Sequence, residues 1–203
     1  AEHKTNCFKC IKNGACELQA MAREYGIDVP NFKSSHGDVQ PEPFDAHPFL
    51  SYDPGLCIQC QRCISTCAKA TGRHALSLER NGARVYVKVP FGEGWENSLC
   101  ESCGNCAQAC PTGALTIKRR KDYREWEVKK VRTTCPHCAT GCQMDLYVKD
   151  GKIVDVQGAD GPSNHNLLCV KGRSGSFDFV DCDARIRYPL IKNKETGEFE
   201  RAT

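Results

Sequence analysis

The sequence predicts an α+β fold built from small modules that depend on bound groups more than on large hydrophobic cores. Sixteen of the 203 residues are cysteine, and most of them lie in tight groups. Between these groups the sequence contains one helical pattern and two pairs of alternating strands. Modules of this size bury too little apolar surface to be secure alone, so we expect the cysteines to hold ligands that stabilise them.

The spacing of the cysteines favours metal binding over disulfide bonds. Cysteines three or four residues apart suit a shared metal centre, whereas the disulfides of small secreted domains usually form longer crosslinks. No signal peptide precedes the first cysteine, and we therefore expect a reducing, cytoplasmic location. No stretch approaches the roughly 18 consecutive apolar residues of a membrane helix, so we expect no membrane span.

The first predicted module, residues 1–48, contains one helix followed by an extended, proline-rich connector. Leu18, Met21 and Tyr25 recur at helical spacing, and Gly26 follows where a helix commonly ends. We expect this apolar stripe to pack into the core.

The second predicted module, residues 49–122, contains one cysteine pattern twice, which indicates an internal repeat. Alternating residues between the two copies flank an Asn-Gly dipeptide that begins at Asn81 and predicts a hairpin. The third predicted module, residues 127–203, has a second predicted hairpin around the Asp-Gly dipeptide that begins at Asp150.

The repeated pattern predicts two [4Fe-4S] clusters. A C-x2-C-x2-C run presents three sulfurs to one cubane, and in two-cluster bacterial ferredoxins the fourth cysteine of each run binds the other cluster. Structural zinc usually takes two separated C-x2-C pairs instead. Pro111 follows the second copy as in those ferredoxins, whereas Ala68 follows the first. The predicted ligands are Cys57, Cys60, Cys63 and Cys110 for one cluster, and Cys67, Cys100, Cys103 and Cys106 for its partner.

The third module has a C-x2-C-x3-C group and one more cysteine far downstream. By spacing alone, these residues could hold a [4Fe-4S] cluster or a zinc ion. They are Cys135, Cys138, Cys142 and Cys169.

The first module has only three cysteines, so a further cluster needs a different fourth ligand. We predict His3 together with Cys7, Cys10 and Cys16, since imidazole can replace thiolate on iron. Four clusters then use every cysteine except Cys182, which we interpret as a free thiol. The other histidines lack such spacing and are interpreted as ordinary surface or packed residues; they are His36, His47, His74, His137 and His165.

The formal charge of +3 is misleading if clusters are bound. Adding fifteen thiolates and four oxidised cluster cores changes it to about −4. We therefore expect no nucleic-acid partner. The basic run at residues 118–121 is interpreted as a solvated linker, with neutralisation of a nearby reduced cluster as the alternative.

Together these motifs resemble the amino-terminal part of the catalytic subunit of cytoplasmic, NAD(P)-linked or hydrogenase-linked formate dehydrogenases of the molybdenum/tungsten bis-pterin family. The first module is similar, through HKTNCFKCIKNGACELQ, to a histidine-ligated module of the large peripheral complex I subunit and of [FeFe] hydrogenases. The third module resembles the entry domain of molybdopterin oxidoreductases through CPHCATGCQMDLYVKDGKIVDVQG, NHNLLCVKGR and RIRYPLI. That resemblance favours a cluster over zinc there.

The resemblance implies electron transfer between a formate site with Mo- or W-bis-pterin guanine dinucleotide and a partner subunit, either NAD(P)-binding flavin/iron-sulfur or hydrogenase. It implies the order pterin, third-module cluster, ferredoxin pair and His3 cluster, with Lys171 between cluster and pterin. The family's [2Fe-2S] pattern and its formate-site residues are not in this sequence, so we expect a part of a longer subunit.

Three alternatives to a formate dehydrogenase stay open at this point. A stand-alone polyferredoxin would carry electrons between several partners. Another bis-pterin oxidoreductase or a complex I-like subunit would share the third module, but complex I subunits generally lack two intact ferredoxin halves. A structural zinc protein would bind zinc without sulfide.

Overall fold

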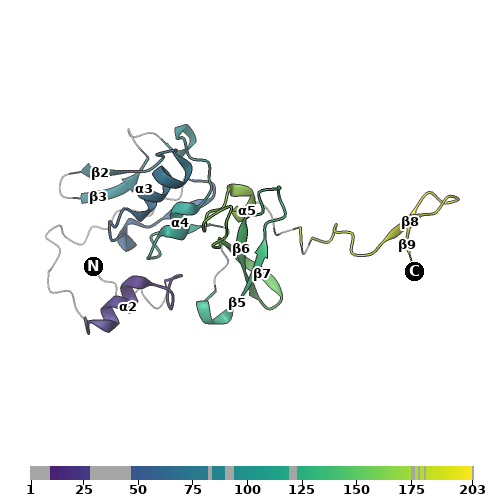
Figure 1. The fold of residues 1–203 in the computed structure, drawn as a ribbon, viewed down its shortest axis with the longest axis horizontal. Coiled ribbons are helices and arrows are strands. Elements are labelled where there is room, and N and C mark those ends of the chain that lie inside the picture. Colours follow the sequence, from purple (N-terminus) through teal and green to yellow (C-terminus); the bar gives the residue numbers. More distant parts are fainter. Residues whose placement is uncertain are drawn as a thin grey trace.

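The computed structural model describes residues 10–27, 47–81, 84–89, 94–118, 123–174, 177, 179–180 and 182–202. Within these residues the chain forms short helices and antiparallel sheets of two or three strands. The elements run from a purple helix near the N-terminus to a yellow hairpin at the opposite end of the molecule (Figure 1). The predicted α+β fold of small modules is confirmed.

The predicted first helix is present as α2, Glu17–Glu24, and Gly26 follows it with a φ of +62°. The predicted core packing of its apolar stripe is wrong. No side chain of α2 is buried, and Met21 and Tyr25 are 53% and 73% exposed. Helical spacing identifies residues that share a face, but it does not determine whether another element covers that face. The predicted connector lies outside the described residues.

The central module is closed by two strands that are far apart in the sequence. β1, Leu50–Tyr52, pairs antiparallel with β4, Leu115–Ile117. Between them, the two copies of the repeat form the helices α3, Arg62–Thr66, and α4, Asn105–Ala109, which contact each other. Because each helix carries the third cysteine of its copy, this contact brings the two halves of the repeat together.

The first predicted hairpin is confirmed, with β2, Ser77–Asn81, paired to β3, Arg84–Lys88. It packs on β1 through a small core that also contains two cysteines. Four short helical turns also occur within the described ranges; they are η1 at Pro54–Leu56, η2 at Cys67–Thr71, η4 at Trp95–Asn97 and η5 at Glu125–Glu127. The core residues are Leu50, Tyr52, Cys63, Leu76, Val87, Cys106, Ala107, Ala114 and Leu115.

The next module is a three-stranded antiparallel sheet in the order β5-β6-β7. β6, Gln143–Lys149, and β7, Lys152–Gly158, form the second predicted hairpin, and Asp150 has the positive φ of +51° that its turn requires. β5, Lys129–Thr134, was not predicted. Its residues are mostly exposed on both faces, so they show no alternation of polar and apolar side chains.

Helix α5, Val170–Ser174, follows the sheet and contacts β7. The chain ends in an exposed hairpin of β8, Leu190–Lys192, and β9, Phe199–Arg201, which extends away from the other elements (Figure 1). Among the helices that the structure describes, none is long and apolar enough to cross a membrane.

Candidate metal centres

Two cavities of the central module are lined by the cysteines of the repeat. One cavity, of about 330 Å³, has three neighbouring cysteines of the first copy together with the last cysteine of the second copy. The other, of about 390 Å³, has the reverse combination. The cysteines are Cys57, Cys60, Cys63 and Cys110 in the first cavity, and Cys67, Cys100, Cys103 and Cys106 in the second.

The two copies of the repeat build their first cysteines into the same local turn. Gln59 and Ser102 have φ values of +56° and +57°. Their backbone N–H groups donate to the sulfurs of Cys57 and Cys100, each at 3.4 Å. Since a main-chain N–H aimed at sulfur favours a negatively charged sulfur, this turn suits thiolate ligands of a metal centre.

Burial makes these thiols hold their protons unless a cation replaces them. It raises the pKa of Cys63 to about 12, and burial likewise raises the pKa of Cys106 and of Cys100. A thiolate in such a place is stable only beside positive charge, which bound iron supplies. The donor set of each cavity therefore fits a [4Fe-4S] cluster.

The four cysteines of the third module are also grouped. Burial is the main cause of the raised pKa of Cys142, and repulsion by Cys135, Cys138 and Cys169 adds to it. Cys138 is exposed, and its pKa is lowered mainly by the Thr140 hydroxyl, which lies 3.3 Å from its sulfur. Across the described parts of the chain, no group of three or more His, Cys, Asp or Glu is arranged to hold a single metal ion.

Only half of the predicted ligand set of the first module can be located, because His3 and Cys7 lie outside the described residues. Cys10 lies against the central module, with its sulfur 2.8 Å from where a side chain on Gly113 would begin. Arg124 donates to the carbonyl oxygen of Cys10 from the other side.

Helix α4 joins the central module to the three-stranded sheet through two side-chain amides. Asn105 donates to the carbonyl of Leu168 at 3.0 Å and accepts from its N–H at 3.1 Å. Gln108 makes the same pair of contacts with Gly158, each at 2.9 Å. Each amide therefore satisfies a backbone donor and acceptor as a neighbouring strand would.

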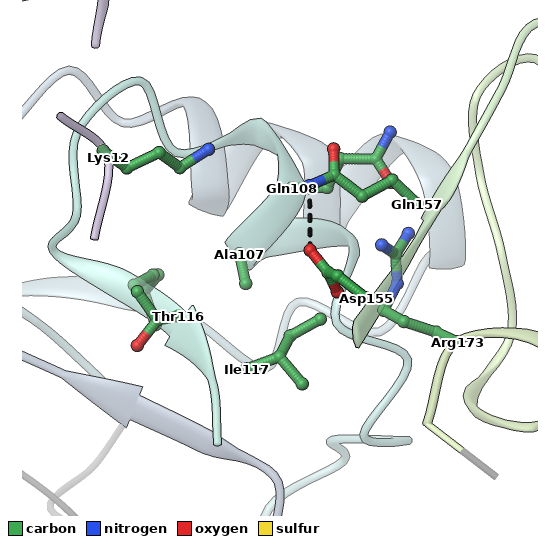
Figure 2. A pocket seen from close by; sticks show the side chains of 9 residues that line it. Lys12, Ala107, Gln108, Thr116, Ile117, Asp155, Gln157 and Arg173 are labelled. Carbon is green, nitrogen blue, oxygen red and sulfur yellow. Dashed lines mark hydrogen bonds between the residues drawn. The ribbon is translucent and has the colours of Figure 1, made fainter. Parts of the chain in front are cut away.

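Arg173 of α5 is 5% exposed and reaches into this junction. Its guanidinium donates to the carbonyl of Cys103 and to Asn105 Oδ1, both at 2.8 Å, while its Nη1 is buried with no hydrogen-bond partner among the described residues. Figure 2 shows Arg173 beside Asp155, whose carboxylate accepts a hydrogen bond from Gln157, at a cavity of about 320 Å³. A buried cation with an unused donor fits a place beside the anionic centre that four thiolates create.

Several residues around these sites were not found by sequence reasoning. His47 was interpreted as an ordinary residue, yet it is 2% exposed and its Nε2 lies 3.5 Å from the sulfur of Cys100. Asn105, Gln108 and Arg173 were not considered. Their contacts cross between modules, so no local spacing could have revealed them.

Three family models match successive parts of the chain. The NADH-ubiquinone oxidoreductase-G iron-sulfur binding region matches residues 1–30. The ferredoxin-like domain of NADH-quinone oxidoreductase subunit 3 matches residues 48–116. The molybdopterin oxidoreductase Fe4S4 domain matches residues 128–178.

Curated relatives match nearly the whole chain, which spans only about a quarter of their length. The second G-type subunit of the NADH-quinone oxidoreductase of Rhizobium meliloti (strain 1021) is 35% identical over 99% of this chain and 24% of its own. The NADPH-Fe(3+) oxidoreductase subunit alpha of Geobacter sulfurreducens is 30% identical over 95% of this chain and 22% of its own. The "Putative formate dehydrogenase SH0748" of Staphylococcus haemolyticus is 28% identical over 98% and 24%. The chain is therefore an iron-sulfur, electron-transfer region related to those of NADH-quinone oxidoreductase G-type subunits and of formate dehydrogenase-like oxidoreductases.

Proposed function

We propose that this chain carries four [4Fe-4S] clusters within a larger formate dehydrogenase and connects a Mo- or W-pterin site with a flavin, NAD(P) or hydrogenase partner. The observation that supports the clusters best is the exchange of the fourth cysteine between the two cavities of the central module. That exchange is typical of two-cluster ferredoxins. When bound, such clusters take up and release single electrons.

The proposed ligands are those that the sequence predicts, with module boundaries at residues 1–48, 49–122 and 127–203. The central cavities hold two clusters. The third module uses Cys135, Cys138, Cys142 and Cys169, and the first uses His3, Cys7, Cys10 and Cys16.

Contacts between modules support one order of the sites. Cys10 adjoins Gly113, which follows the cavity of Cys110 closely in the chain. On the other side, Arg173 donates to the carbonyl of Cys103, so α5 adjoins the second cavity. We therefore infer the order third-module site, Cys103 cavity, Cys110 cavity and first-module site.

We assign Lys171 to the pterin side of the third-module site. After the Thr140 hydroxyl and backbone, the charge of Lys171 is a further cause of the lowered pKa of Cys138, which places the two side chains near each other. A cation there would favour electron arrival at the site.

A subunit of an NADH-quinone oxidoreductase is the second candidate. The 35% identity with the second G-type subunit of Rhizobium meliloti, over 99% of this chain, favours it. The two functions differ in the electron source, which is formate in the first and NADH in the second.

The experiment compares the wild-type full-length subunit with two variants. Formate should reduce all clusters of the wild type, as followed by low-temperature paramagnetic resonance. Cys138→Ala should block reduction of the other clusters by formate and leave their reduction by dithionite unchanged. Cys182→Ala, which alters an exposed free thiol, is the matched control and should behave as wild type.

Two results would reject parts of this function. Full reduction of the Cys138→Ala variant by formate would reject the order of the sites. Reduction of the wild type by NADH together with no reduction by formate would replace the first candidate with the second.

A further inference from the structure

His47 is a buried imidazole whose proton position is fixed by its contacts. Its Nδ1 accepts hydrogen bonds from the backbone N–H groups of Phe49 and Leu50 at 3.0 and 2.9 Å. A ring nitrogen that accepts carries no proton, so the ring N–H is at Nε2. Trp95 packs edge-on against the ring, with 4.6 Å between centroids, and holds its orientation.

The Nε2 atom of His47 faces the sulfur of Cys100 at 3.5 Å. Because Nε2 carries the proton, the imidazole is the donor and the sulfur is the acceptor. This contact comes in addition to the N–H of Ser102, which donates to the same sulfur at 3.4 Å.

Tyr52 has a comparable place at the other cavity. It is 6% exposed and lines the cavity of Cys57, and its oxygen accepts from the N–H of Val87 at 3.3 Å. The hydroxyl proton is therefore available to a second partner. Burial is the first cause of the raised pKa of Tyr52, and a hydrogen bond with Cys57 is the second.

The two halves of the repeat thus match in their backbone donors and differ in one side-chain donor each. The main-chain N–H bonds to Cys57 and Cys100 have the same length. An imidazole N–H serves one sulfur and a phenol O–H the other. These two donors come from one short segment that begins at His47 and ends within β1, so that segment is positioned to make the two sites unequal.

We propose that His47 and Tyr52 are positioning residues that each donate a hydrogen bond to a ligand sulfur of a different cluster and so set the two reduction potentials separately. The inference rests on the proposed clusters of the central module. A hydrogen bond to sulfur favours the reduced state, which carries more negative charge, so its loss should make reduction harder.

The test is a redox titration of the iron-loaded protein, followed by paramagnetic resonance, for three variants. Tyr52→Phe removes only the hydroxyl. His47→Asn keeps an oxygen that can accept from the backbone N–H groups but does not extend to the sulfur. His47→Gln places an amide N–H near the former Nε2 and is the rescue variant. Iron content serves as the control for folding.

Each of the first two variants should lower the midpoint potential of one central cluster and leave the other unchanged. The expected change in the reduction equilibrium is about tenfold, which is about 59 mV for one electron. His47→Gln should shift its cluster less than His47→Asn. The same cluster moving in Tyr52→Phe and His47→Asn, or no shift in variants with full iron content, would overturn the inference.

The outcomes separate this inference from the function on which it rests. A wild-type protein without iron, or without paramagnetic signals after reduction, would remove the clusters and the proposed function with them. Normal signals with unchanged potentials in Tyr52→Phe and His47→Asn would remove only the roles of these two donors.

Discussion

Single residues at the junction between modules carry the closest packing in the described structure. Gly104 precedes α4 with a φ of +71°, and a Cβ atom there would lie 2.5 Å from Cδ of Arg173. Gly72 has a similar φ of +64°, but a Cβ atom there would meet nothing within 4 Å. The two glycines therefore separate backbone strain from close packing.

We predict that Gly104→Ala destabilises the iron-loaded protein more than Gly72→Ala. Both changes place alanine in the left-handed region, at a cost of roughly 1 kcal/mol. Only Gly104→Ala must also displace a buried arginine that donates to Cys103 and Asn105. Anaerobic denaturant unfolding measures the difference, and equal losses of unfolding free energy would contradict this packing.

The predicted ligands and their supporting residues differ in how far the sequence revealed them. Cysteine spacing is local, because one loop wraps around one cluster, and it led to the two groups that line the central cavities. His47 and Arg173 act across the fold, and a lone histidine or arginine has no local pattern that distinguishes it from a packed or solvated residue. Their roles required the three-dimensional contacts.

At the scale of elements, α4 is the helix that couples the central module to the three-stranded sheet. Gln108 of this helix bonds both backbone groups of the buried Gly158 and also the carbonyl of Asn166. On the sheet, Gln157 lines the same junction but donates only to Asp155 beside it among the described residues, at 3.2 Å. The two glutamines provide a matched pair for testing the junction.

We predict that Gln108→Ala lowers the unfolding free energy by about 1–3 kcal/mol, because it leaves the N–H and carbonyl of Gly158 without partners. Gln157→Ala should have a much smaller effect. Denaturant unfolding measures stability, and hydrogen exchange at the Gly158 amide should be faster only in the first variant. Unchanged exchange there would show that the amide does not hold the modules together.

The elements that the sequence predicted correctly are those with a turn signal of their own. Both hairpins contain Asn-Gly or Asp-Gly, which favour tight turns through positive φ. β5 lacks alternation because most of its side chains are exposed, and β1 and β4 are three residues each. For α2 the helix was correct and its burial was wrong, since burial depends on a partner surface that the helix does not encode.

At the scale of the whole molecule, the sites account for features that a protein without clusters leaves unexplained. The core of the central module includes Cys63 and Cys106, whose sulfurs line cavities instead of packing as small apolar groups. Arg173 buries a positive charge where the central and third modules meet. Both features become favourable when anionic iron-sulfur centres fill the cysteine groups, so the fold and its ligands depend on each other.

The most direct test of this account is the iron and acid-labile sulfide content of the chain purified without oxygen. Four clusters predict about sixteen irons and about sixteen sulfides per chain. Zinc without labile sulfide, or iron for far fewer than four clusters in fully folded protein, would contradict the account.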